Sequence, residues 1–326
     1  MTLARSHPEI SCRRCPLDCR RHARGCCPAR ASRGIHRAAA ASRQPGRAAV
    51  LAVAVWAALT PRPGHAKNAS AAPQARAATA AAKTAGDETA ALRRALQVLV
   101  VSTPGWDAPR GIAQRFIRDT TTATFRRVGE PLPVWVGRSG LAWRSDAAAA
   151  VRPAGVAELA GPRKQEGDGR SPAGILTLGA MWGYAEAPPE GVKLPYKTAT
   201  ELDRCVDDAG SPYYNRLTRQ PASGPPPWHS AEALRLPTDH YKQLVVMNYN
   251  NQTPRRGAGS CIFLHIAPPP GGPTAGCTAL AQADLLTVLR WLDPAQAPVL
   301  LQLPTTVLAA AAAAWGIPAE LLMRSN

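Results

Sequence analysis

A histidine and a cysteine are close together in the stretch Ser260–Leu280, which reads SCIFLHIAPPPGGPTAGCTAL. His265 lies near the end of an apolar segment, and eleven residues rich in Pro and Gly separate it from Cys277. A thiolate is a strong nucleophile, and a nearby imidazole can take its proton. Gly276 allows close approach of the backbone, so nearby N–H groups are candidates to stabilise an oxyanion. The pattern favours a cysteine nucleophile.

The residues around this pair predict a strand, a loop and a helix. Cys261–Ile266 has the composition of a strand, and Ala281–Leu292 carries leucines at helical spacing. We expect Cys277 to lie near the N-terminus of that helix, where the pKa of a thiol is lowered. A lone Cys or His is more often a structural residue, so it is their combination on strand, loop and helix that indicates catalysis.

The rest of the folded region reads as mainly β. Short runs rich in Val, Ile and Leu recur between Gly, Pro, Asn and Ser residues, as strands do. Phe125–Pro133 is interpreted as two strands joined by a Gly turn, and the Ala-rich Val307–Trp315 as a helix. The other predicted strands are Gln97–Val101, Leu132–Val136, Ile175–Leu178, Leu244–Met247 and Val299–Leu303.

The N-terminal part has the pattern of an export signal. Ala48–Leu59 is an uncharged apolar run that follows basic residues and precedes the small residues of Gly64–Ala66. It is shorter than the ~20 residues of a spanning helix, so a stable membrane span is not expected; the alternative is a buried Ala/Val helix. The predicted organisation is a basic leader with signal peptide (1–66), an Ala-rich linker (67–95), a catalytic domain (96–304) and an Ala-rich tail (305–326).

Basic residues and cysteines are concentrated in the N-terminal part of the chain. The formal charge is +17, but the leader holds 12 of the 39 Lys and Arg and only two of the 22 acidic residues. It lacks the interleaved aromatic residues of a nucleic-acid-binding module, so no nucleic-acid partner is expected. Five of the eight cysteines also lie there, and their loose spacing does not favour a metal site.

The three remaining cysteines suggest a disulfide. Export favours an oxidising compartment, and Cys277 must stay free if it is catalytic. We therefore hypothesise a disulfide between Cys205 and Cys261.

The region of the His–Cys pair resembles the L,D-transpeptidase catalytic-domain family, which has the YkuD-like fold. His265 and Thr274–Cys277 match the family's His followed by a spaced Ser/Thr-x-Gly-Cys. Glu166–Gly174 is similar to its Gly-Asp-x-x-Thr-Pro-x-Gly turn, with Ser171 in the Thr position. The resemblance covers about 96–304. Segments similar to one exported bacterial branch are Val134–Trp143, Cys205–Asp208, Tyr213–Arg216, Trp228–Ser230 and Gly259–His265.

The resemblance implies a β-sandwich-like domain that needs no cofactor or metal and cleaves peptidoglycan stem peptides between an L-centre and a D-residue. Cys277 would attack the carbonyl, His265 would serve as general base and later protonate the leaving amine, and the Ile266 carbonyl would orient the imidazole. Gly276 and Cys277 N–H groups would form the oxyanion hole. An amine would then give a crosslink, whereas water would give a carboxypeptidase. The implied role is cell-wall biogenesis and cell shape, in the periplasm or cell envelope.

Two positions depart from the family pattern. Many members carry His where this chain has Ala275, and Arg where it has Ala279. Arg138, Arg170 or Arg216 would have to replace that Arg as a carboxylate clamp.

Further candidate contacts lie outside the Cys motif. Thr274 and His229 are candidates for substrate binding, whereas Asp207 and Asp208 are interpreted as turn residues. Two other functions stay open: a catalytically weakened cell-wall-binding module, and a zinc peptidase using His229, His265, Cys277 and an Asp. The oligomeric state is not predicted.

Overall fold

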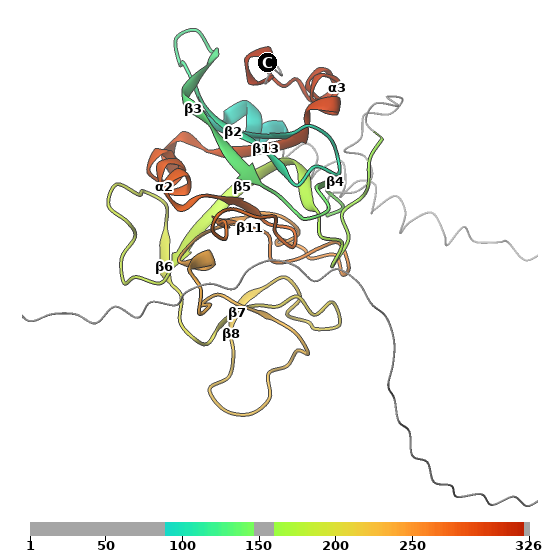
Figure 1. The fold of residues 1–326 in the computed structure, drawn as a ribbon, viewed down its shortest axis with the longest axis vertical. Coiled ribbons are helices and arrows are strands. Elements are labelled where there is room, and N and C mark those ends of the chain that lie inside the picture. Colours follow the sequence, from blue (N-terminus) through green and yellow to red (C-terminus); the bar gives the residue numbers. More distant parts are fainter. Residues whose placement is uncertain (1–88, 147–159, 323–326) are drawn as a thin grey trace, which may run out of the picture. The chain divides into compact units, whose positions relative to one another are not determined.

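Ten strands form one sheet that closes on itself through a pairing of β10 with β5. The computed structural model describes residues 89–146 and 160–322, all within the unit Ala66–Asn326. The strand order is β10-β11-β12-β3-β2-β1-β13-β5-β4, with β6 beside β5, and the additional pairing of β10 with β5 closes the path. Figure 1 shows the strands as arrows, with β2, β3, β4, β5, β6, β11 and β13 of this sheet labelled. The strands are β1 (Gln97–Thr103), β2 (Arg110–Arg118), β3 (Phe125–Trp135), β4 (Leu141–Trp143), β5 (Ser171–Gly183), β6 (Tyr196–Thr198), β10 (Gln243–Met247), β11 (Phe263–Ile266), β12 (Thr278–Leu280) and β13 (Val299–Pro304).

Closure of the sheet creates the main hydrophobic core and confirms the predicted mainly β fold. The central strands β1 and β13 are buried along their whole length, and they pair in parallel. Helix α2 (Gln282–Trp291) adds Leu285, Val288 and Leu289 to this core, and α3 (Thr305–Trp315) adds four further buried side chains. The predicted tail therefore packs on the same core as the predicted catalytic domain. Short 3-10 helices are η3 (Asp239–Tyr241), η4 (Pro294–Gln296) and η5 (Ala319–Leu321).

The predicted leader, with its export signal and five cysteines, and most of the predicted linker lie outside the described residues. In the part of the chain that the structure describes, no helix is both long and apolar enough to cross a bilayer.

The interpretation of Phe125–Pro133 as two strands is wrong. The segment belongs to the single strand β3, which pairs with β2 on both sides of a register shift between Ala113 and Arg115. Gly129 has φ +63° at this irregularity, and the Gln114 side chain donates to the carbonyls of Val128 and Gly129. The glycine thus permits a β-bulge rather than a turn.

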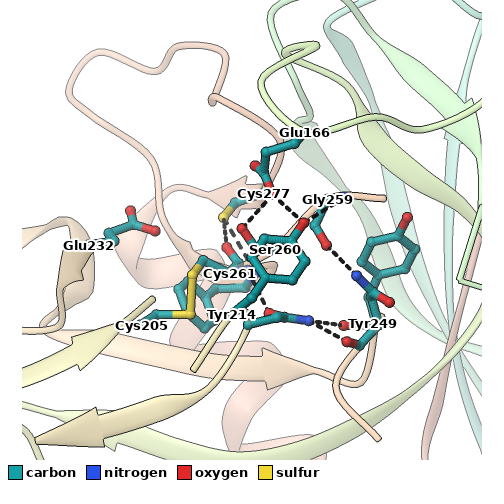
Figure 2. Close-up of a disulfide and its surroundings, with 12 residues drawn as sticks. Glu166, Cys205, Tyr214, Glu232, Tyr249, Gly259, Ser260, Cys261 and Cys277 are labelled. Atoms are coloured by element: carbon teal, nitrogen blue, oxygen red, sulfur yellow. Dashed lines mark hydrogen bonds between the residues drawn. A yellow bond between two sulfur atoms is a disulfide. The ribbon is translucent and has the colours of Figure 1, made fainter. Parts of the chain in front are cut away.

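A second, three-stranded sheet is attached by a disulfide. It has the order β8-β7-β9, with β7 (Asp203–Cys205), β8 (Leu217–Arg219) and β9 (Glu232–Ala233). Cys205 at the end of β7 is bonded to Cys261, just before β11, which confirms the hypothesised disulfide (Figure 2). The Asn215 side chain strengthens this attachment, because it accepts from the Cys261 N–H and donates to the carbonyls of Tyr249 and Asn250.

Candidate active site

The pairing of β11 with β12 brings the predicted histidine and cysteine to one face. These strands are parallel, with His265 opposite Ala279. Cys277 precedes Ala279 by two residues, and Phe263 precedes His265 by two, so all four side chains share a face of the sheet. The Phe263 N–H lies 3.3 Å from Cys277 Sγ, as this register requires.

The turn that presents Cys277 is held by the hydroxyl groups of Thr274, which is half-buried, and Ser171, which is buried. Thr274 Oγ1 donates to the Cys277 carbonyl at 2.6 Å and accepts from the Gly276 N–H at 3.1 Å. Ser171 Oγ donates to the same carbonyl at 2.7 Å and accepts from the Gly137 N–H at 2.8 Å. The Gly276 N–H, an expected oxyanion-hole donor, is thus engaged by Thr274 in this structure.

Cys277 does not lie at a helix N-terminus. Strand β12 separates it from α2, which begins at Gln282, because residues 278–280 extend the sheet instead of starting the helix. The thiol is buried and donates to the Cys261 carbonyl, with Sγ 3.4 Å from the oxygen. Burial, together with the charge of Glu232, raises the pKa of Cys277. The expected lowering of the thiol pKa is therefore wrong, since burial disfavours the thiolate.

His265 has a fixed orientation. Its Nδ1 is 2.9 Å from the Ile266 carbonyl oxygen, the contact that the family resemblance implied. The Tyr241 ring meets the imidazole edge to face, with centroids 5.1 Å apart. Burial lowers the pKa of His265 to about 4, so the imidazole is neutral around pH 7.

Cys277 and His265 open into a cavity of about 590 Å³. The loop 273–277 lines one part of it, and the segments before β11 and around η3 line others. The charged and titratable side chains at its surface, apart from Cys277 and His265, are Arg138, Lys164, Glu166, Asp207, Glu232, His240 and Tyr241.

Three carboxylates give the cavity an acidic wall. Glu166 accepts from the hydroxyls of Tyr214 and Ser260 (Figure 2). Glu232 on β9 accepts from the Tyr241 hydroxyl. Burial, and then the charges of Asp207 and Glu166, raise the pKa of Glu232 to about 7. Sequence reasoning missed Glu232 and Tyr241, because no local pattern links them to the Cys motif.

The predicted substrate-binding residues do not all reach this cavity. Arg138 and Thr274 line it. Arg170 instead forms an ion pair with Asp107 and donates to backbone carbonyls. The His229 side chain is 99% exposed and bonds to Asp208, away from the residues that line the cavity.

Other predicted residues have structural contacts. Arg216 donates to the carbonyls of Asn251 and Gln252. Asp208 accepts from the N–H groups of His229 and Gly210, as a turn residue does, and these bonds lower the pKa of Asp208 to about 2.

The zinc alternative lacks an assembled ligand set. Its proposed ligand His229 is not among the residues that surround Cys277 and His265. Within residues 89–146 and 160–322, no group of three His, Cys, Asp or Glu side chains is placed to hold a metal ion.

Comparison with known proteins gives a family match. A family model described as an L,D-transpeptidase catalytic domain matches residues 118–301, a range that includes both His265 and Cys277. Among solved structures, the chain is similar to the helical cell shape determining protein Pgp2 from Campylobacter jejuni, at 15% identity and a TM-score of 0.29. That likeness covers 67% of this chain and 54% of the other, so the chain spans about half the length of that protein. No curated protein matches the chain.

Proposed function

The chain belongs to the L,D-transpeptidase catalytic domain family, and we propose that it is a cysteine acyltransferase acting on peptidoglycan stem peptides. The observation that carries the proposal is the placement of Cys277 beside His265 on one face, in a cavity of about 590 Å³. Such a cavity is in the size range of small-ligand sites. The acyl group passes through a Cys277 thioester to an amine, as in an L,D-transpeptidase, or to water, as in an L,D-carboxypeptidase.

His265 and the turn before Cys277 assist this chemistry in our proposal. The contact of His265 Nδ1 with the Ile266 carbonyl leaves Nε2 as the nitrogen available to exchange protons with the leaving and arriving groups. The Cys277 N–H is a donor for the oxyanion, joined by the Gly276 N–H when substrate displaces its contact with Thr274. Thr274 and Ser171 position the nucleophile through its own carbonyl.

Arg138 is our candidate for the carboxylate clamp. It lines the cavity, and its backbone N–H donates to the Thr274 carbonyl, which ties it to the catalytic turn. Ala279 lies opposite His265 and has no charge to offer there. A guanidinium can bind a carboxylate through two parallel hydrogen bonds, so Arg138 would supply what Ala279 lacks.

The protein acts, we propose, outside the cytoplasm, in the periplasm or cell envelope. The Cys205–Cys261 disulfide supports this location, since structural disulfides persist in oxidising compartments. The apolar run and basic residues of the predicted leader support it as well.

A second candidate function is a cell-wall-binding module with weakened catalysis. The buried Cys277 thiol favours it, because its raised pKa keeps the resting sulfur protonated. Ala275 and Ala279 also remove side chains that many family members carry at the site.

Covalent labelling separates the two functions. The purified protein is incubated with a tetrapeptide stem and, separately, with a carbapenem, beside Cys277→Ala. Because five cysteines lie in the predicted leader, the adduct is located by mass in the tryptic peptide Gly257–Arg290, which contains Cys277. An enzyme gives an adduct at Cys277 in the wild type and releases a D-amino acid. Binding of the stem by both proteins, with no adduct and no release, would support the binding module instead.

A further inference from the structure

The small three-stranded sheet is linked to His265 through two side chains. Glu232 on β9 accepts a hydrogen bond from the hydroxyl of Tyr241 in η3. The Tyr241 ring meets the His265 imidazole edge to face, with centroids 5.1 Å apart and ring planes at 82°. Both Glu232 and Tyr241 line the cavity that holds Cys277. The three side chains therefore form one line of contacts from the small sheet to the imidazole.

A single hydrogen bond fixes only part of the orientation of the imidazole. Nδ1 of His265 lies 2.9 Å from the Ile266 carbonyl oxygen, which holds that nitrogen and selects the tautomer. The ring can still tilt about this contact, and a tilt moves Nε2, the nitrogen that exchanges protons in our proposal. The buried Tyr241 ring opposes the tilt, because it packs against the imidazole and also against Phe263, with centroids 5.7 Å apart. Tyr241 thus supplies a second fixed contact for the ring.

The hydrogen bond to Glu232 holds the Tyr241 ring from its far end. Tyr241 belongs to a single turn of 3-10 helix, whose hydrogen bonds have poorer geometry than those of an α-helix. Glu232, in contrast, lies on a paired strand, opposite Cys205 in the pairing of β7 with β9. Cys205 is joined by the disulfide to Cys261, just before β11. The acceptor of the Tyr241 hydroxyl is therefore connected to the strand that carries the histidine.

From these contacts we infer that Tyr241 is a positioning residue for His265, and that Glu232 acts on the imidazole through the Tyr241 hydroxyl. The inference rests on the proposed function, in which His265 exchanges protons with the reacting groups. The O–H bond of Tyr241 stays intact throughout, and its ring acts by confining the imidazole. Misplacement of a reacting group by about 1 Å costs about 100-fold in rate, so confinement affects catalysis through geometry. The inference gives the small sheet a role, which is to support the orientation of the histidine.

The rate of acylation by a carbapenem tests this role, followed by mass in the tryptic peptide Gly257–Arg290. Tyr241→Phe keeps the ring and loses the bond to Glu232, whereas Glu232→Ala loses the same bond from the other side. Each variant should react about tenfold more slowly than the wild type, as loss of an orienting partner does. The double variant should react no more slowly than either single variant, because both substitutions remove one bond. Glu232→Gln keeps an acceptor oxygen and should restore a rate near that of the wild type.

Tyr184→Phe is a matched control for the loss of a tyrosine hydroxyl. The Tyr184 hydroxyl donates to the Thr238 carbonyl at 3.1 Å and accepts from the Leu236 N–H at 2.9 Å. Its hydrogen bonds thus hold the segment before η3 and do not involve Glu232. We expect Tyr184→Phe to lose unfolding free energy, as Tyr241→Phe does, and to keep the acylation rate of the wild type. This comparison separates a loss of stability from a loss of position.

Nitrogen-15 NMR of the His265 ring measures its orientation without any substrate. The contact of Nδ1 with the Ile266 carbonyl predicts a single neutral tautomer with the proton on Nδ1 at pH 7. In Tyr241→Phe and in Glu232→Ala, the two ring signals should move towards the average of the two tautomers. Glu232→Gln and Tyr184→Phe should keep the wild-type signals. The spectrum of His265→Gln identifies these signals by their loss.

Three results would overturn the inference. The first is a wild-type rate and wild-type ring signals in both Tyr241→Phe and Glu232→Ala. The second is multiplication of the two rate effects in the double variant, because Glu232 would then act independently of the Tyr241 hydroxyl. The third is a rate in Glu232→Gln as low as in Glu232→Ala, because the charge of Glu232 would then matter and not its bond to Tyr241. If no protein is acylated, the wild type included, the proposed function alone is overturned, and the ring signals decide the inference.

Discussion

Removal of the disulfide should lower the stability of the protein substantially. Cys205 and Cys261 are 56 residues apart in the sequence, and the bond joins the three-stranded sheet to the segment before β11. A crosslink restricts the unfolded chain, and the loop-entropy relation gives about 4 kcal/mol for a loop of this length. We expect Cys205→Ala/Cys261→Ala to lose about 3–5 kcal/mol of unfolding free energy.

Urea denaturation measures this loss. With a slope of about 2–3 kcal/mol per molar urea, the midpoint of the double variant should fall by about 1.5 M. Wild-type protein treated with reductant should unfold at the same urea concentration as the double variant. A loss below about 1 kcal/mol would refute the reasoning, because the crosslink would then place little restriction on the unfolded chain.

The Cys205→Ala/Cys261→Ala variant also tests whether the disulfide affects the geometry of the site as well as the stability of the fold. The effect of the crosslink is chiefly on the unfolded state, and the hydrogen bonds of Asn215 hold the small sheet to the Cys261 segment independently of it. We therefore expect iodoacetamide to alkylate Cys277 in the folded double variant at the wild-type rate. A clearly different rate would show that the disulfide itself positions the segment before β11.

Two further substitutions test the site. Ser171→Ala removes a buried hydroxyl that bridges the Gly137 N–H and the Cys277 carbonyl, so unfolding free energy should fall by about 2–3 kcal/mol and acylation should slow, whereas Ser171→Thr should keep both properties. Glu232→Gln should gain stability over the wild type as pH rises. The folded-state pKa of Glu232 is raised from 4.5 to about 7, so its contribution is fully present below pH 4.5 and is lost by pH 7. The difference should reach up to about 3 kcal/mol between pH 4 and 8, measured by urea unfolding; a constant difference would contradict the raised pKa.

The local pattern of the sequence determined the main strands and helices and identified His265 and Cys277 as the candidate catalytic pair. Alternation and β-branched composition located strands such as β1 and β13, and helical spacing located α2. These patterns involve residues only a few positions apart in the sequence, so they can be recognised without knowledge of the fold. The disulfide followed from counting the cysteines outside the leader, since Cys277 had to remain free.

Only the tertiary structure decided the surroundings of Cys277. Gly129 forms a bulge rather than a turn because β2 pairs on both sides of it. The thiol has a raised pKa because closure of the sheet buries it and β12 separates it from α2. Glu232 and Tyr241 line the cavity of Cys277 from β9 and η3, whose positions depend on a disulfide and on packing between segments distant in sequence. Burial and long-range contacts, which set these pKa values, arise only when the whole chain has folded.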